Sequence, residues 1–398
     1  MGILDEIARH EVWDSFLTDK TDRGLLSKRE KEEISAFMES GRYLTLAREL
    51  RSFSAGNYPV PERIEINKKG TGRKRVVYCY DRDLTVMLKL IGYLLYRYDG
   101  KIDPRCYSFR RHLNAKNAIR DIVSISGING MYFYKTDVRD YFNSIPPQKL
   151  ASVLEEVISD DQELLTFLKG IILQEGPGEN RGAMAGVPVS AFFADIYLRE
   201  VDASFAGSGI EYFRYSDDII IFADSEEKLR EGIESLRRQL EAAGLEENPD
   251  KELTGKPGDP WEYLGFRFEK GKIRLSGVSL SKIKAKIRRK SHSLYRWRKR
   301  KGVEFEKTAR KMIRIFNAKF FDDGDENDFT WSRWFFPVLT DPSDLREIDR
   351  YLVENIRYLR TGRYYKGNYA VSYEDIKALG YRSLMNEYYR FRESKSTE

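Results

Sequence analysis

Two segments of the sequence place carboxylates directly beside apolar strand candidates. Asp217 and Asp218 stand in a Tyr-Ser-Asp-Asp segment between two apolar stretches, and Asp137 ends an apolar stretch that begins at Tyr132. Asp is a poor strand former and a good turn former, so an ordinary surface turn explains the Asp pair taken alone. Together the two segments predict three acidic groups that converge at one edge of a sheet.

Converging carboxylates repel one another unless a cation neutralises them. Mg²⁺ prefers oxygen ligands and keeps waters that a substrate phosphate can replace. Two such ions about 3.5 to 4 Å apart clamp the attacking and leaving oxygens of an in-line phosphoryl transfer. The pattern of Asp137, Asp217 and Asp218 therefore favours two-metal phosphoryl transfer.

Composition excludes several other chemistries. The 398 residues are 41% hydrophobic and include three His and two Cys, with no Cys/His cluster at metal-ligand spacing. This excludes zinc fingers, zinc hydrolases and iron–sulfur sites and favours a reducing compartment. The start of the chain shows no leader or myristoylation signal, and no segment reaches about 18 uninterrupted apolar residues. We expect a soluble cytoplasmic protein without a membrane partner.

Positive charge is concentrated in one segment. Residues 282–319 carry 16 Lys and Arg against two Glu, a local charge of +14, whereas the net charge of the chain is only +6. Ile283, Ile287 and Leu294 recur at helical spacing and predict an amphipathic helix with a cationic outer face. Such a face fits a polyanion. A solvated helix face explains the charge equally well.

The order of expected elements indicates an α+β fold. Residues 5–52 favour two helices, with Ser27 and Glu30 spaced as a capping box. A basic hairpin is expected over 63–80 and a helix over 84–98. The centre alternates short strand candidates with helical stretches, at 132–138, 211–215, 219–223 and 263–268. After Gly271 the chain becomes basic and helical.

Taken together, these segments resemble the ordered blocks of a reverse transcriptase over roughly residues 60 to 270. The matching blocks are the basic hairpin ending in Arg75, the segment 106–111 with Ser108 in place of the family's Gly, the Asp137 block, the helix entry 186–198, the hairpin 215–218, and the segments 244–251 and 262–266. The resemblance implies a right-hand polymerase with fingers, palm and thumb. It places a helical N-terminal extension at 1–58, fingers at 59–128, the palm at 129–270 and a basic helical thumb and C-terminal region at 271–398.

The resemblance also implies roles for the carboxylates. Asp137 and Asp217 would ligate two Mg²⁺ ions, for which Mn²⁺ can substitute. Asp218 would support the site as a further metal-binding carboxylate, and the backbone carbonyl of Val138 would add a ligand.

The resemblance also implies which residues contact the incoming nucleotide. Arg75 and one of Lys68, Lys69 or Arg73 would neutralise the triphosphate. Phe142 would lie under the sugar of the incoming nucleotide and exclude a ribose 2′-OH, or else be an ordinary core aromatic. The remaining candidates are Arg110 near template or nucleotide, Gly186 at the helix entry, and Lys251, which would protonate departing pyrophosphate or simply face solvent.

Contacts to nucleic acid are expected further along the chain. Tyr263, Leu264 and Gly265 resemble the strand that grips the primer end. The basic thumb helix would lie along a template–product duplex through Lys282, Lys286, Arg289, Lys290, Arg296 and Arg298.

One residue that departs from the family pattern, and two domains that the sequence lacks, narrow the type of reverse transcriptase that the chain resembles. Ala185 stands where the family usually has a Gln that contacts the nucleotide, which hints at an unusual template or product. The segment after 270 is basic, aromatic and helical, and its Asp cluster at 322–328 favours a loop, whereas a fused ribonuclease H would need its own sheet and four carboxylates. His292 is the only His after His112, which excludes a His-dependent endonuclease. We therefore expect a stand-alone bacterial enzyme similar to phage-defence and abortive-infection reverse transcriptases, with the retron type second.

The expected partners are dNTPs, a DNA product and an RNA template, most simply a dedicated non-coding RNA. A second protein or a second copy of the chain is left open as a further partner. Template-independent or protein-primed DNA polymerisation is the first alternative activity, and a catalytically silent RNA-binding scaffold is the second.

Overall fold

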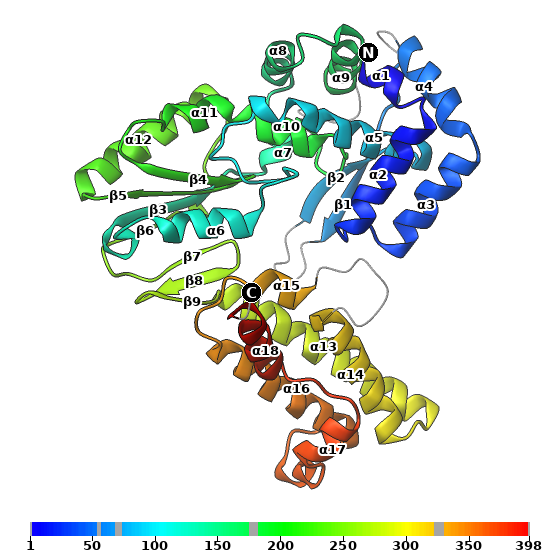
Figure 1. Cartoon of the computed structure of the whole chain (residues 1–398), viewed down its shortest axis with the longest axis vertical. Helices are drawn as coiled ribbons and strands as arrows, with labels where there is room; N and C mark the ends of the chain where they lie inside the picture. Colours follow the sequence, from blue (N-terminus) through cyan, green and yellow to red (C-terminus); the bar gives the residue numbers. More distant parts are fainter. Residues whose placement is uncertain (1, 54–56, 68–73, 175–181, 322–329, 397–398) are drawn as a thin grey trace. The chain divides into compact units, whose positions relative to one another are not determined.

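The computed structural model describes residues 2–53, 57–67, 74–174, 182–321 and 330–396 (Figure 1). Lys68, Lys69 and Arg73, three of the predicted phosphate-neutralising cations, lie outside the described residues. The chain divides into two compact units, Met1–Pro257 and Gly258–Glu398. Within the described part of the chain, no helix is both long and apolar enough to cross a membrane.

The first unit begins with four helices, a hairpin and a long helix: α1 (Ile3–Glu6), α2 (His10–Asp22), α3 (Lys28–Glu39), α4 (Arg42–Ser52), β1 (Glu62–Asn67), β2 (Lys74–Cys79) and α5 (Arg82–Leu95). The predicted capping box forms, because Ser27 Oγ accepts from the Glu30 N–H at 3.3 Å and the Glu30 carboxylate accepts from the Ser27 N–H at 3.0 Å. β1 and β2 pair antiparallel, with Ile66 opposite Arg75.

A four-stranded antiparallel sheet forms the centre of the first unit. Its order is β4-β5-β3-β6, with the strands β3 (Tyr132–Asp137), β4 (Glu211–Tyr215), β5 (Asp218–Ala223) and β6 (Leu253–Gly255). Residues 219–223 of β5 are all buried, which explains their unbroken apolar run. Helix α12 (Glu226–Ala242) covers one face of the sheet and α6 (Ala115–Ser124) lies on the other (Figure 1). The α+β prediction is confirmed.

The other elements of the first unit connect these layers. They are η1 (Tyr96–Lys101), η2 (Ile128–Gly130), α7 (Tyr141–Ser144), α8 (Pro147–Val157), α9 (Gln162–Leu173), α10 (Ser190–Tyr197), α11 (Arg199–Ser204) and η3 (Pro249–Lys251). Helix α10 is apolar on nearly every side and packs against α5 and α8, so the core of the unit is built around it.

The second unit joins a three-stranded sheet to a set of helices. Its elements are β7 (Trp261–Tyr263), β8 (Phe266–Glu269), β9 (Lys272–Leu275), α13 (Gly277–Lys301), α14 (Phe305–Phe321), α15 (Trp331–Phe335), α16 (Ser343–Thr361), η4 (Lys366–Ala370), α17 (Tyr373–Ala378) and α18 (Leu384–Ser396). The division after Pro257 falls before the palm boundary expected at 270, because β8 pairs with both β7 and β9 and this sheet belongs to the second unit. Helix α13 is the predicted basic helix, and it packs on α14 and α16.

Candidate active site

The strand register brings the three predicted aspartates to one end of the central sheet. Asp137, the last residue of β3, is the direct cross-strand partner of Asp218, the first residue of β5. Asp217 lies in the tight turn between β4 and β5, where Ser216 adopts a left-handed φ of +59°. The Val138 N–H donates to the Asp217 carbonyl at 3.1 Å, which ties the turn to the end of β3. The turn chemistry of Ser and Asp thus sets the position of Asp217.

These carboxylates differ in their surroundings. The Asp137 side chain is only 17% exposed, and its Oδ2 lies 3.3 Å from Lys251 Nζ. Burial raises the pKa of Asp217 to about 6; a hydrogen bond from its own backbone N–H opposes this rise, Asp218 and Asp137 add to it, and Arg75 opposes it. Asp218 lies 3.4 Å from Lys135 Nζ. Each carboxylate therefore has a cation close enough to interact with it.

A divalent cation fits two of these three groups. Asp137 Oδ1 is buried and has no hydrogen-bond partner among the described residues. A buried carboxylate oxygen without a donor is a group that a hard cation would satisfy. Among the described residues, no three His, Cys, Asp or Glu side chains are gathered closely enough to hold a metal on their own. Any ion held by Asp137 and Asp217 would therefore need backbone and substrate oxygens as further ligands.

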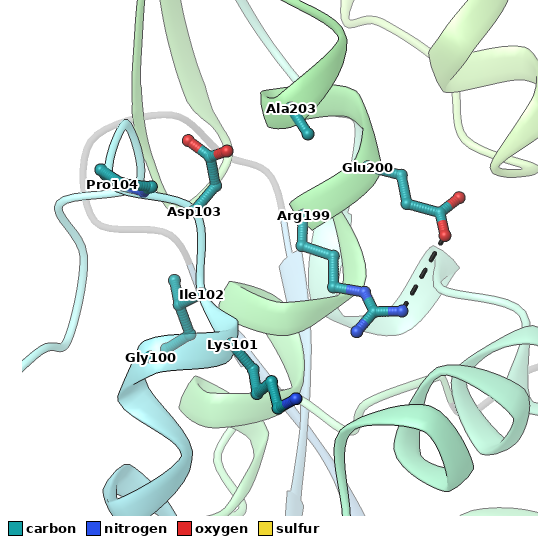
Figure 2. A pocket seen from close by; sticks show the side chains of 8 residues that line it. All are labelled: Gly100, Lys101, Ile102, Asp103, Pro104, Arg199, Glu200 and Ala203. Carbon is teal, nitrogen blue, oxygen red and sulfur yellow. Dashed lines mark ion pairs between the residues drawn. The ribbon is translucent and has the colours of Figure 1, made fainter. Parts of the chain in front are cut away.

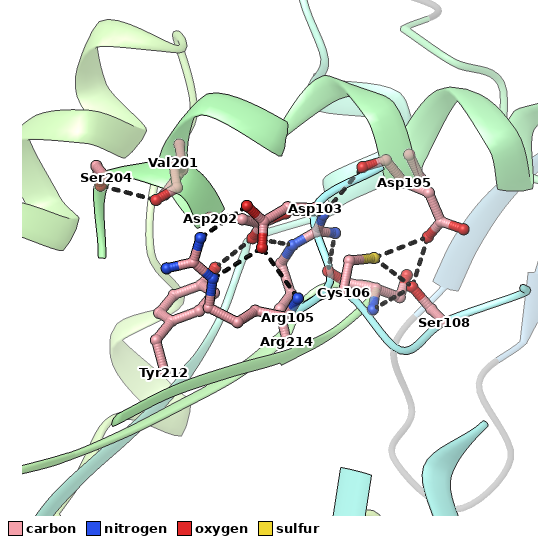
Figure 3. Close-up of polar contacts among 12 residues, drawn as sticks. Asp103, Arg105, Cys106, Ser108, Asp195, Val201, Asp202, Ser204, Tyr212 and Arg214 are labelled. Carbon is pink, nitrogen blue, oxygen red and sulfur yellow. Dashed lines mark hydrogen bonds and ion pairs between the residues drawn. The ribbon is translucent and has the colours of Figure 1, made fainter. Parts of the chain in front are cut away.

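A buried ion pair supports the turn that carries Asp217, and the sequence pattern did not indicate this pair (Figure 3). Arg214 on β4 is fully buried and donates from Nε and Nη2 to the two carboxylate oxygens of Asp202 on α11, at 2.6 Å each. Its Nη1 donates to the Ser216 carbonyl at 3.2 Å, and its Nη2 also donates to the Asp195 carbonyl at 2.9 Å. Arg214 thus joins α10 and α11 to the turn that carries Asp217.

Ser108 forms a second support of the turn (Figure 3). Its hydroxyl donates to Asp195 Oδ1 at 2.5 Å and accepts from the Ser216 N–H at 2.9 Å. Burial raises the pKa of Asp195 to about 7, against the opposing effects of Arg214 and of hydrogen bonds from Ser108, Cys106 and a Tyr hydroxyl. An Asp inside an apolar helix is buried only when it is paired, so its position in the apolar stretch 191–198 was a usable signal.

The segment around Gly186 is joined to the strand that carries Arg75. The Tyr78 N–H donates to the Ala185 carbonyl at 2.7 Å, and Asn143 accepts from the Ala185 N–H at 3.0 Å. Asn143 also donates to the Val76 carbonyl at 3.2 Å. Gly186 has a φ of +102°, and a Cβ there would meet the Tyr78 carbonyl oxygen at 2.9 Å. Only Gly fits this position without strain.

Two other residues predicted to contact the nucleotide, Arg110 and Phe142, lie in different surroundings. Arg110 forms a two-pronged ion pair with Asp99 at 2.7 and 2.6 Å and also donates to the carbonyls of Asp103 and Cys106. Its side chain is 10% exposed, and its described partners are these protein oxygens. Phe142 is half-buried, and its ring lies edge-on to Phe109 at 6.3 Å between centroids.

In the second unit, the predicted primer-grip residues form the turn between β7 and β8. Tyr263 is buried, whereas Leu264 and Gly265 have φ values of +49° and +90°. The Gly265 carbonyl accepts from the Ser276 N–H at 2.9 Å and from Ser279 Oγ at 3.0 Å. The turn is thereby fixed to the start of α13.

The cations of α13 fall into two groups. One set faces solvent or is partly exposed: Lys282, Lys286, Arg289, Lys290 and Arg296. Arg298 differs, because its Nη1 donates to the carbonyls of Leu359 and Arg360 at 3.2 and 2.9 Å. Arg298 therefore neutralises the negative C-terminal end of α16, and these two hydrogen bonds hold its guanidinium there.

A surface pocket of about 360 Å³ lies elsewhere in the first unit (Figure 2). It is lined by Gly100, Lys101, Ile102, Asp103, Pro104, Arg199, Glu200 and Ala203. None of the predicted site residues lines it, and Arg199 is paired with Glu200 at 3.9 Å. The pocket is therefore separate from the carboxylate site.

Known proteins resemble this chain over the same region. The family model described as reverse transcriptase (RNA-dependent DNA polymerase) matches residues 66–268. The retron Ec86 reverse transcriptase of Escherichia coli is 24% identical over 234 residues, which cover 56% of this chain and 67% of that protein.

Two solved telomerase structures are also similar. An apo telomerase from Candida tropicalis, truncated from the C-terminal domain, has a TM-score of 0.40 at 13% identity and covers 56% of this chain. A telomerase from Candida albicans with a fragment of telomeric RNA has a TM-score of 0.39 at 13% identity and covers 83% of this chain. The chain spans 56% and 62% of these two proteins, less than two thirds of each. Since the family model matches just over half of the 398 residues, including all three aspartates, the chain belongs to the reverse transcriptases, the nucleotidyltransferases that act as RNA-directed DNA polymerases.

Proposed function

We propose that this chain extends a primer with dNTPs on an RNA template, using two Mg²⁺ ions held by Asp137 and Asp217. The backbone carbonyl of Val138 adds a ligand, and Asp218 supports the site beside Lys135. The observation that carries the proposal is the buried Asp137 Oδ1, which has no hydrogen-bond partner in the described structure and lies at the same sheet end as Asp217.

The side chains around the carboxylates support each part of the reaction. When bound, the metal ions would activate the primer 3′-hydroxyl and stabilise charge on the leaving oxygen. Lys251, 3.3 Å from Asp137 Oδ2, would protonate departing pyrophosphate. Arg75, on the strand joined to Gly186, would neutralise the triphosphate. Phe142 would exclude a ribose 2′-OH and so favour dNTPs.

Substitution of Asp217 tests this assignment. Asp217→Asn keeps the shape of the side chain but removes its charge, and the loss of a metal-ligating carboxylate costs several kcal/mol in the transition state, so we expect primer extension to slow by at least about 10²-fold. Asp224→Asn, at an exposed Asp just after β5 that pairs with Lys228, is the matched control and should retain the wild-type rate. An Asp217→Asn variant that extends primers normally would exclude the proposed metal site.

The second unit would hold nucleic acid. Its turn at 263–265 would contact the primer end, and the exposed cations of α13 would lie along the template–product duplex. Lys282, Lys286, Arg289 and Arg296 recur at the helical period and share one face, so they can follow a backbone of phosphates. Arg298 is left out of this surface because the end of α16 occupies it.

The biological setting follows from the family resemblance. We place the protein in the bacterial cytoplasm, where it would copy a dedicated non-coding RNA as part of defence against phage. A retron function is the second candidate, favoured by the 24% identity to the retron Ec86 enzyme over 234 residues. Purifying the protein from its host and sequencing the attached RNA and DNA separates the two, since branched RNA–DNA selects the retron function.

Template-independent synthesis is a further candidate because Ala185 lacks the side chain that the family uses against the nucleotide. In the structure Ala185 contributes backbone hydrogen bonds to Tyr78 and Asn143. Sequencing the product decides between the two activities: a faithful copy of a bound RNA excludes template-independent synthesis, and a sequence unrelated to any bound RNA supports it.

A further inference from the structure

Phe109 has an unusual degree of exposure for an aromatic side chain. Its side chain is 43% exposed, and among the described residues of the first unit it is the only exposed Phe, Tyr or Trp. The other large apolar side chains exposed in this unit are Leu, Val or Ile. Single exposed apolar residues are common on protein surfaces. The position and backbone of this one set it apart.

The backbone of Phe109 is strained. Its φ of +54° lies in the left-handed region, which bulky residues rarely adopt. Such a conformation persists only where the surrounding structure imposes it, and it is concentrated at sites with a function. The exposed ring stands between Ser108, which is buried, and Arg110, whose side chain is only 10% exposed.

Both neighbours of Phe109 are anchored to the protein. On one side, Ser108 is fully buried and bonded to Asp195 and to the Ser216 N–H. On the other side, Arg110 is held by Asp99 in a two-pronged ion pair. The ring is therefore presented from a fixed support, which lowers the entropy cost of binding a partner.

The ring lies among residues of the proposed active site. Its centroid is 6.3 Å from that of Phe142, the proposed sugar-contacting residue, and 6.3 Å from that of Tyr215, which precedes the catalytic turn. A flat apolar face at this place matches a nucleobase, because every base has a π-face that stacks on an aromatic ring.

We infer that Phe109 is a stacking platform for a nucleobase of the base pair being formed at the active site. The inference rests on the proposed function and goes beyond it by assigning a substrate contact to a residue that acts in neither metal nor phosphate binding. The base belongs either to the template or to the incoming dNTP.

Single-nucleotide incorporation by the full chain tests the platform. Phe109→Leu keeps an apolar side chain but removes the ring, and Phe109→Tyr keeps the ring. Since stacking on an aromatic residue contributes roughly 5- to 150-fold in affinity, we expect Phe109→Leu to raise the KM for dNTP at least about 5-fold, with Phe109→Tyr close to wild type. Val123→Ala, at a side chain of similar exposure on α6, is the matched control.

A template with an abasic site opposite the incoming nucleotide identifies the base. An effect of Phe109→Leu that disappears on this template assigns the platform to the template base, and an effect that persists assigns it to the dNTP. Equal KM values for wild type and Phe109→Leu on both templates would overturn the inference, as would equal losses in the Leu and Tyr variants.

A binding measurement separates this inference from the proposed function. A fluorescent primer–template with a dideoxy-terminated primer is titrated with each variant, with and without the next complementary dNTP, and its anisotropy is recorded. Wild-type protein that binds this substrate but never extends a normal primer would refute the proposed polymerase activity alone. Weaker binding by Phe109→Leu than by Phe109→Tyr in this assay supports the platform, and equal binding by both overturns it.

Discussion

Replacing Arg214 should separate stability from activity in this protein. Arg214 and Asp202 are both fully buried and joined by two hydrogen bonds of 2.6 Å. Arg214→Met leaves the Asp202 carboxylate buried without its cation, and breaking a buried pair in this way costs about 3 to 5 kcal/mol. The matched control is Arg105→Met, because Arg105 forms the same two-pronged pair with Asp103 but the two side chains are 25% and 10% exposed, so its loss should cost less than the loss of Arg214.

The double variant Arg214→Met/Asp202→Asn carries the main argument. It removes both buried charges and keeps an acceptor for the Tyr212 hydroxyl, which bonds Asp202 at 2.7 Å. Most of the lost stability should therefore return, about 2 to 3 kcal/mol. Activity should not return, because the Ser216 carbonyl still lacks the Arg214 donor that holds the turn carrying Asp217.

Urea denaturation of each variant gives the free energy of unfolding, and primer extension under the same conditions gives the rate. The expected pattern is a stable double variant with a rate well below wild type. A double variant that regains both stability and full activity would show that Arg214 only neutralises Asp202. A stable Arg214→Met single variant would refute the assigned cost of the buried carboxylate.

Three further outcomes are expected. Burial raises the pKa of Asp195 to about 7 in the folded protein, so the protonated carboxyl contributes stability that is fully present below its ordinary pKa and is lost as the pH rises to about 7. In thermal unfolding, wild type should therefore lose about 2 kcal/mol relative to Asp195→Asn between pH 5 and 7, with little further loss at higher pH. Gly186→Ala should destabilise the first unit by about 1 to 3 kcal/mol in urea, because of its φ of +102° and the contact with the Tyr78 carbonyl, and unchanged stability would contradict this. Lys251→Met removes the cation beside Asp137 from a side chain that is 61% exposed, so stability should change little, whereas pre-steady-state incorporation should slow by about 10²-fold or more if Lys251 is the acid.

The sequence predicted those parts of the fold that depend on local signals. The strands at 132–138, 211–215 and 219–223 form within one residue of their expected ends, because apolar runs and turn residues specify them locally. The Ser27 capping box formed for the same reason. The position of Asp137 opposite Asp218 is a register that the hairpin and the buried face of β5 impose.

The residues that hold the turn carrying Asp217 could not be predicted from local sequence signals. Ser108 and Asp195 are 87 positions apart, and their hydrogen bond depends on how α10 packs against the sheet. Arg214 and Asp202 gain their roles only from complete burial, which is a property of the assembled core. The different environment of Arg298 could have been predicted from the sequence. The helical period places Arg298 about 160° around the helix from Lys282, so the two side chains face different ways.

The arrangement of cations around the three aspartates has a consequence for how the site works. Lys251 contacts Asp137 at 3.3 Å, Lys135 contacts Asp218 at 3.4 Å, and Arg75 opposes the rise that burial causes in the pKa of Asp217. Of the two lysines, Lys251 has the more exposed side chain, 61% against 23%, so it can leave its carboxylate at a lower cost in packing. Under the proposed function, a ligand that takes over Asp137 displaces Lys251 toward solvent, where the leaving pyrophosphate would be. Under the same proposal, the ion pair between Lys251 and Asp137 would hold the proton donor close to the place where it acts.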